Sequence, residues 1–187
     1  MRLCLHSGSD KFALYPAIRD ILCRTGAGLH VKAAGTTWLE EFAGPAAAGG
    51  GALSQAKEVY RQAWPAYEEL VAPYAAVVDI RRERLPSPDE IRRWSAAEFV
   101  AAVVHDPTNP AFQPDLRQFL HVAYPVAARM SAEFLSALDA HRSEIEPRVT
   151  SNLLVRHLRP CSPPKRRAVR PLSVQGGCLR NLPPSGS

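Results

Sequence analysis

Apolar positions in the first 80 residues alternate between strand-like and helix-like spacing. Residues 2–6 predict a short strand, residues 12–25 follow with helical periodicity, and residues 29–34 predict a second strand. Residues 75–80 form an apolar, β-branched run that predicts a third, buried strand. Strands that alternate with helices are typical of a parallel sheet covered by helices, so the predicted fold class is α/β.

The rest of the chain predicts helices. Thr36 or Thr37 is expected to cap a helix, and residues 45–51, rich in Gly and Ala, are expected to form a linker. Residues 116–140 predict one long amphipathic helix, and residues 149–158 a short one. Two capping boxes, each a serine followed three residues later by a glutamate, predict helix starts near residues 88 and 96. These pairs are Ser87 with Glu90 and Ser95 with Glu98.

Three parallel strands leave sheet edges and apolar faces uncovered, and the first strand begins at residue 2. We therefore expect N-terminal strands that this chain lacks to complete the sheet. The predicted architecture is a partial (β/α) barrel or a parallel-sheet fragment, with long C-terminal helices.

The composition changes after Pro160. Residues 161–187 are rich in Pro, Arg, Gly and Ser and lack apolar periodicity, so we predict a disordered, non-native tail after an α/β domain at residues 1–160. The tail contains five basic residues and no acidic one, so its charge of +5 accounts for the whole net charge of the chain. The body is thus neutral overall, and a nucleic-acid-binding face is not indicated.

The sequence shows no recognisable targeting signal or cysteine motif. The four cysteines form no CxxC pair, and no apolar run is long enough to cross a bilayer. The first ten residues do not match a signal peptide. We expect a cytoplasmic protein with reduced thiols and no membrane partner.

Candidate chemistry lies at the ends of the first two strands. His6 ends the first strand, and active sites of parallel α/β folds lie at the carboxyl ends of strands. His30 and Lys32 are two residues apart, so their side chains share one face of the second strand. Imidazoles from neighbouring strands would suit Zn²⁺, Ni²⁺, Mn²⁺ or Co²⁺, and the ammonium would bind a substrate carboxylate or stabilise an enolate oxygen.

Simpler interpretations stay open for these residues. His6 could be a turn histidine bonded to backbone, His30 a core residue, and Lys32 a side chain that reaches solvent from a strand edge. Asp10 could cap a helix or orient His6. Cys4 is most simply a small core residue. His121 and His157 are expected to be packed or solvent-facing histidines of helices.

Four stretches carry a resemblance to a known family. They are residues 5–12 (LHSGSDKF), 29–40 (LHVKAAGTTWLE), 120–124 (LHVAY) and 152–160 (NLLVRHLRP). On these stretches the chain resembles the tagaturonate epimerase family, whose members are roughly twice as long. The resemblance implies a metal-dependent epimerase that interconverts the sugar acids D-tagaturonate and D-fructuronate, here truncated and inactive alone. It further implies metal binding by His6 and His30, and substrate binding by Lys32, Ser7 and Asp10.

The implied reaction inverts a carbinol carbon β to the ketone, whose C–H bond the carbonyl does not acidify. Retro-aldol cleavage with re-addition and a transfer of oxidation level between adjacent carbons are the two routes, and both develop charge on an oxygen that a divalent metal would stabilise. The residues do not identify the general acid or base. The alternatives are a non-enzymatic α/β fragment and a barrel-type sugar isomerase with another substrate.

Overall fold

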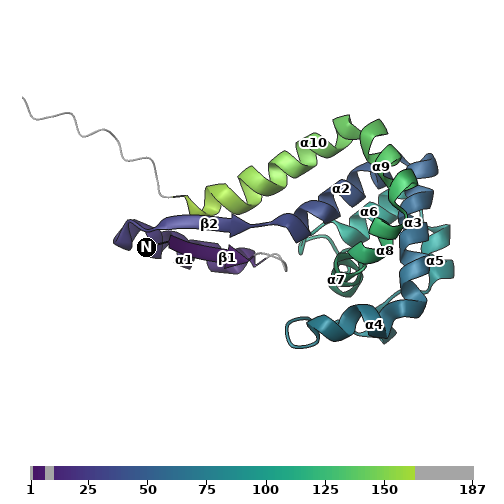
Figure 1. Cartoon of the computed structure of the whole chain (residues 1–187), viewed down its shortest axis with the longest axis horizontal. Coiled ribbons are helices and arrows are strands. Elements are labelled where there is room, and N and C mark those ends of the chain that lie inside the picture. The colour runs from purple at the N-terminus through teal and green to yellow at the C-terminus, as the bar shows by residue number, and fades with distance from the viewer. Residues whose placement is uncertain (1, 7–10, 163–187) are drawn as a thin grey trace, which may run out of the picture.

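Two short parallel strands, β1 (Arg2–His6) and β2 (Gly28–Lys32), form a sheet at one end of the molecule (Figure 1). The structure, a computed structural model, describes residues 2–6 and 11–162. The 3₁₀ turn Phe12–Leu14 and helix α1 (Tyr15–Thr25) connect the strands, and Gly26 ends α1 with a φ of 61°. The predicted strand–helix–strand unit is therefore confirmed.

Helices make up most of the rest of the described chain. They are α2 (Ala34–Ala48), α3 (Gly50–Ala63), α4 (Tyr67–Val71), α5 (Pro88–Arg93), α6 (Ala96–Val103), α7 (Pro114–Val122), α8 (Tyr124–Arg129), α9 (Ser131–Ala140) and α10 (Arg142–Thr150). A π-helical segment, η5 (Ser151–Leu158), and α11 (Arg159–Cys161) follow α10 back to the sheet (Figure 1). The described fold is thus mostly helical with one small parallel sheet.

The apolar interior consists of two separate clusters. The larger one joins α2 through α8, with Tyr60, Phe99 and Phe119 fully buried. The smaller one lies under the sheet and consists of Leu5, Tyr15, Ile18, Leu22 and Cys161. Cys161, which the sequence analysis placed in the tail, therefore belongs to the packed body. Residues 163–187, on which the rest of the tail prediction falls, lie outside the described residues.

The predicted third strand at residues 75–80 is wrong. The chain there leaves a 3₁₀ turn, Ala72–Tyr74, and continues as a loop in which the Val77 amide donates to the Tyr74 carbonyl. Val77 is 77% exposed, whereas Ile80 is buried and its carbonyl accepts a hydrogen bond from the Tyr67 hydroxyl at 2.6 Å. Because these hydrogen bonds are local, the apolar run is a loop anchored at Ile80.

The predicted linker at residues 45–51 is also wrong over most of its length. Helix α2 continues through Pro45 to Ala48, and only Gly49, with a φ of 78°, separates it from α3. Pro45 and Ala46 are buried in α2, and the neighbouring Gly44 is a packing position. A Cβ on Gly44 would lie 3.0 Å from Cγ1 of Ile145, so the glycine lets α2 and α10 approach closely.

Two other helix predictions need correction. Helix α2 begins at Ala34 after Ala33, so neither Thr36 nor Thr37 is its N-cap, and the Thr37 hydroxyl instead donates to the Ala33 carbonyl at 2.9 Å. The single helix predicted at residues 116–140 is divided into α7, α8 and α9. Pro125 lies in the first turn of α8, where its missing N–H is tolerated, but it cannot continue α7.

The two capping boxes are confirmed. The Glu90 amide donates to the Ser87 hydroxyl, and the Ser87 amide donates to the Glu90 carboxylate at 2.6 Å. Ser95 and Glu98 repeat the arrangement at the start of α6. These hydrogen bonds to the charged carboxylate lower the pKa of both glutamates.

Candidate functional site

The outer face of the small sheet carries polar side chains. Along β2, Leu29 and Val31 are half-buried whereas His30 and Lys32 are exposed, as the predicted shared face of His30 and Lys32 requires. In β1, Cys4 is exposed as well. Its sulfur lies 3.8 Å from Nδ1 of His30, because the register pairs these two residues across the strands. The expectation that Cys4 is a core residue is therefore wrong.

The predicted metal and substrate residues are only partly described. His6 occupies the register position opposite Lys32, at the carboxyl end of both strands. Ser7 and Asp10, predicted to bind substrate, lie outside the described residues. Within the described part of the chain, no three His, Cys, Asp or Glu side chains are arranged to hold a metal ion.

A pocket of about 540 Å³ opens just beyond the carboxyl end of β2. The residues that line it are Gly35, Thr37, Trp38, Glu41, Tyr74, His121 and Tyr124. Burial raises the pKa of the Glu41 carboxyl above its ordinary value, so the pocket presents a carboxyl that gives up its proton reluctantly. Aromatic walls with a few polar groups are typical of small-molecule sites.

Two hydrogen bonds hold the walls of this pocket. Nδ1 of His121 donates to the Gly35 carbonyl at 3.1 Å, which leaves Nε2 as the acceptor in the neutral ring. Nε1 of Trp38 donates to the Leu120 carbonyl at 3.2 Å. The imidazole of His121 is therefore packed against α2 and forms a wall of the pocket.

Gly35 is required because the imidazole of His121 occupies the space of a side chain. A Cβ on Gly35 would overlap Cε1 of His121, so Gly35→Ala should force the ring away and lower the free energy of unfolding by about 1–3 kcal/mol. Urea denaturation followed by circular dichroism measures the loss. Gly51→Ala is the control, since nothing lies within 4 Å of its added Cβ and alanine favours a helix. A Gly35→Ala protein as stable as the Gly51→Ala protein would contradict this packing.

A buried ion cluster surrounds Glu40, the residue before Glu41 on α2. The Glu40 carboxylate is 3.9 Å from Nη2 of Arg117 and 3.6 Å from Nη1 of Arg156. Glu40 and Arg117 have almost no exposed surface. Arg117 also donates to the Val103 carbonyl at 2.9 Å, and Arg156 to the His105 carbonyl at 2.7 Å.

The same cluster reaches the segment that follows β1. The guanidinium of Arg156 lies over the ring of Phe12, 4.8 Å from its centroid. His157, which is fully buried as a packed histidine, contacts the Phe12 ring edge-on at 5.2 Å. Phe12 is thus the point at which the C-terminal π-helical segment meets the chain leaving β1.

Sequence reasoning did not predict the ion cluster. Its three charges come from α2, α7 and η5, and they are far apart along the chain. The available signal was the position of Glu40 inside the apolar stretch of α2, between Leu39 and Phe42, where a charge needs a partner.

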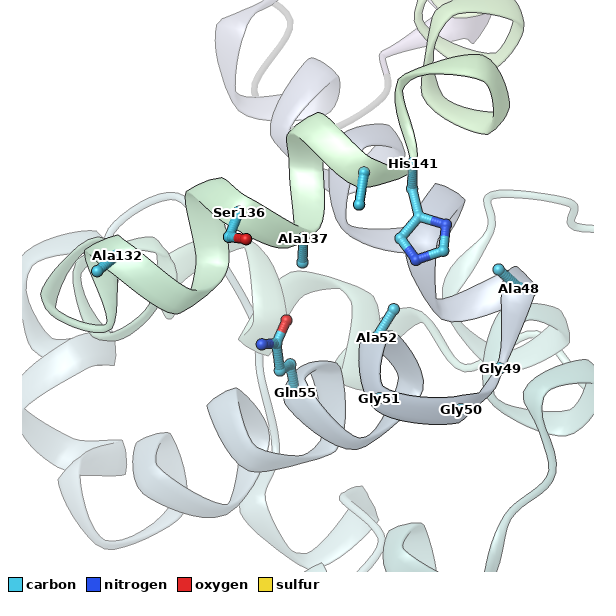
Figure 2. Close-up of a pocket in the computed structure, with 11 residues that line it drawn as sticks. Ala48, Gly49, Gly50, Gly51, Ala52, Gln55, Ala132, Ser136, Ala137 and His141 are labelled. Carbon is cyan, nitrogen blue, oxygen red and sulfur yellow. The ribbon is translucent and has the colours of Figure 1, made fainter.

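A second hollow, of about 730 Å³, lies between the turn from α2 to α3 and helix α9 (Figure 2). Ala48, Gly49, Gly50, Gly51 and Ala52 form one wall, and Ala132 and Ala137 belong to the other. Only Gln55, Ser136 and His141 contribute polar side chains. This hollow is lined mostly by alanine and glycine, so it has fewer groups that could bind a ligand than the pocket beside His121.

The four stretches that carry the family resemblance meet around the start of α2. Phe12 contacts His157, Arg156 pairs with Glu40, and His121 is bonded to Gly35. Residues from the N-terminal, central and C-terminal parts of the chain therefore converge where the sheet joins the helices.

Comparison with known proteins identifies the family of the chain. The family model described as tagaturonate epimerase matches residues 1–157. The tagaturonate/fructuronate epimerase of Thermotoga maritima is 30% identical over 130 residues, which are 66% of this chain and 22% of that protein. The matched region thus spans less than a quarter of the length of this relative. No solved structure matches the chain.

Proposed function

The chain belongs to the tagaturonate epimerase family, and from this premise we propose that it supplies part of the site of a metal-dependent enzyme that interconverts D-tagaturonate and D-fructuronate. The observation that carries the proposal is the convergence of the four family-like stretches around the start of α2, the helix that follows β2. Ligand sites of parallel α/β folds lie at this end of the strands.

The exposed sheet face has the donor chemistry for a divalent ion. His30 is exposed there, and a thiol lies 3.8 Å from its Nδ1. His6 and His30 would hold Zn²⁺, Ni²⁺, Mn²⁺ or Co²⁺. When bound, the ion would supply Lewis acidity to the ketone and a neighbouring hydroxyl of the sugar acid.

The substrate would extend from this face into the pocket beyond β2. Lys32 would bind the carboxylate as a point charge, with Ser7 and Asp10 of the following loop as further contacts. The pocket begins at Gly35, three residues after Lys32, and its Glu41 carboxyl and His121 imidazole would hydrogen-bond hydroxyl groups. Glu41, whose pKa is raised by burial, is suited to holding a proton near the substrate.

Further strands would complete the site. Each of the two strands has one edge without a strand partner among the described residues, and the Thermotoga maritima relative extends well beyond the matched region. We propose that additional strands close the sheet into a (β/α) barrel, and that the 187-residue chain alone is an inactive, truncated form. Within the described residues no helix is long and apolar enough to cross a membrane. The proposed setting is the cytoplasm, with a sugar acid as the partner.

Turnover measurements test this proposal. The purified chain, incubated with D-tagaturonate and each candidate metal, should form no D-fructuronate above the blank, because catalytic groups must be held to a fraction of an ångström. In the Thermotoga maritima relative, alanine at the residue aligned with His30 should remove both metal and turnover. Alanine at the residue aligned with Lys32 should retain the metal and raise KM. Unchanged turnover in both variants would refute the assignment.

A further inference from the structure

The pocket beyond β2 has an acidic group on its wall and no strongly basic one. Glu41 lines it, and no lysine or arginine belongs to its lining among the described residues. The exposed ammonium of Lys32 lies outside the pocket, at the end of β2. A sugar acid that extends from Lys32 into the pocket therefore passes from a cation to a carboxyl.

We propose that Glu41 selects sugar acids whose far end is uncharged and rejects those with a second carboxylate. The inference rests on the proposed function, which places the substrate carboxylate at Lys32. The other end of D-tagaturonate is a neutral hydroxymethyl group, and this end enters the pocket. Glu41 is thus a specificity-determining residue for the same site.

The spacing of the two charges suits a six-carbon acid. The pocket begins at Gly35, three residues after Lys32, and Glu41 lies six residues further along α2. Six helical residues rise about 9 Å. An extended six-carbon acid has a similar length, so its first carboxylate can stay at Lys32 while its other end lies beside Glu41.

The surroundings of Glu41 do not neutralise it. Burial raises the pKa of its carboxyl, and no described cation lowers that pKa. Glu41 also borders a hollow of about 420 Å³ lined by Asp139, Arg142 and Glu146, which add two carboxylates and one guanidinium. A second substrate carboxylate beside Glu41 would be repelled or would force Glu41 to take up a proton, and both lower the affinity.

The other polar groups of the pocket suit a neutral end. Nδ1 of His121 is bonded to the Gly35 carbonyl at 3.1 Å, so this N–H is not offered to an anion. Tyr74 and Tyr124 are 44% and 55% exposed, and they present hydroxyl groups and aromatic faces. Carbons that bear hydroxyl groups can contact these faces without placing a charge near Glu41.

Two six-carbon acids are matched probes of this selectivity. D-gluconate and D-glucarate have the same stereocentres and differ only at the far end, which is a hydroxymethyl group in gluconate and a second carboxylate in glucarate. Ligand-observed NMR titration of the full 187-residue chain measures the Kd of each acid, without added metal so that chelation does not contribute. At about pH 8 an ordinary imidazole is neutral and carboxyls are ionised. The Kd of glucarate should be at least about tenfold higher than that of gluconate.

Variants of Glu41 assign this difference to its charge. Glu41→Gln removes the charge with little change in shape and should bring the two Kd values close together, whereas Glu41→Asp should retain the preference for gluconate. Glu146→Gln is the matched control, because Glu146 is exposed and does not line the pocket. A Glu41→Gln chain as selective as the parent would overturn the proposal. So would a parent chain that binds glucarate as tightly as gluconate, or one that binds neither acid.

Failure of the proposed function gives a different result. Lys32→Ala should raise the Kd of both acids alike, because both carry the first carboxylate. If Lys32→Ala leaves both Kd values unchanged while Glu41→Gln changes their ratio, the carboxylate site at Lys32 is wrong and the selectivity of Glu41 stands. If only Lys32→Ala has an effect, the reverse holds.

Discussion

Replacing Glu40 with alanine should lower the free energy of unfolding by about 3–5 kcal/mol. The Glu40 carboxylate lies between the guanidinium groups of Arg117 and Arg156, at 3.9 and 3.6 Å. Its removal takes a carboxylate away from Arg117, whose side chain is 4% exposed. Removing one partner of a buried ion pair costs much more than the intact pair contributes.

Chemical denaturation of the Glu40→Ala protein gives this loss directly. Glu58→Ala is the matched control, because Glu58 pairs with Arg61 on the surface of α3, where solvent screens the interaction. The control should unfold at nearly the same denaturant concentration as the parent chain. Similar midpoints for both variants would show that the Glu40 cluster is not held in a dry environment.

Replacing Phe119 with alanine should cost a similar amount, about 3–5 kcal/mol. Phe119 is fully buried in α7 and contacts Tyr60 edge-on at 5.7 Å and Tyr67 at 5.4 Å, so it joins α7 to α3 and α4. A cavity at this position removes contacts on several helices at once.

The measurement is thermal or urea unfolding followed by tryptophan fluorescence and circular dichroism together. Leu135→Ala on α9 serves as the comparison, since Leu135 is 57% exposed and its removal leaves no cavity. The free energy of unfolding of the Phe119→Ala protein should fall by the same amount in both signals. That of the Leu135→Ala protein should stay close to the value of the parent chain. A loss below about 1 kcal/mol would mean that the helices around Phe119 repack without it.

Local signals predicted the parts of the fold that local chemistry determines. The serine–glutamate pairs at residues 87–90 and 95–98 satisfy amides within one turn, so their outcome does not depend on distant residues. The end of α1 at Gly26 likewise follows from a left-handed backbone that glycine tolerates. These features could be predicted from the sequence alone.

Features that need a distant partner could not be predicted in the same way. An apolar run such as residues 75–80 becomes a strand only if a neighbouring strand accepts its backbone hydrogen bonds, and the described chain gives it none. The sequence also did not indicate which face of the sheet is buried. Cys4 therefore seemed a core residue, although its neighbour across the strands is the exposed His30.

The candidate site likewise combines features that follow from local spacing with features that depend on distant contacts. Strand alternation was sufficient to place His30 and Lys32 on one face. The pocket beside His121 depends on contacts between α2 and α7, with Gly35 and His121 far apart in the chain. No periodic pattern carries that information.

The apolar interior is divided into two clusters, so the sheet and the helices can differ in local stability. The cluster under the sheet is small and shares no residue with the larger helical one, so β1 and β2 can open as a local unit while the helices stay folded. The Arg156 guanidinium, bound to Glu40 and stacked on Phe12, connects the two units. A ligand that bridges β1 and β2 would suppress this local opening and slow amide hydrogen exchange in both strands, with little effect on exchange in α3 and α7.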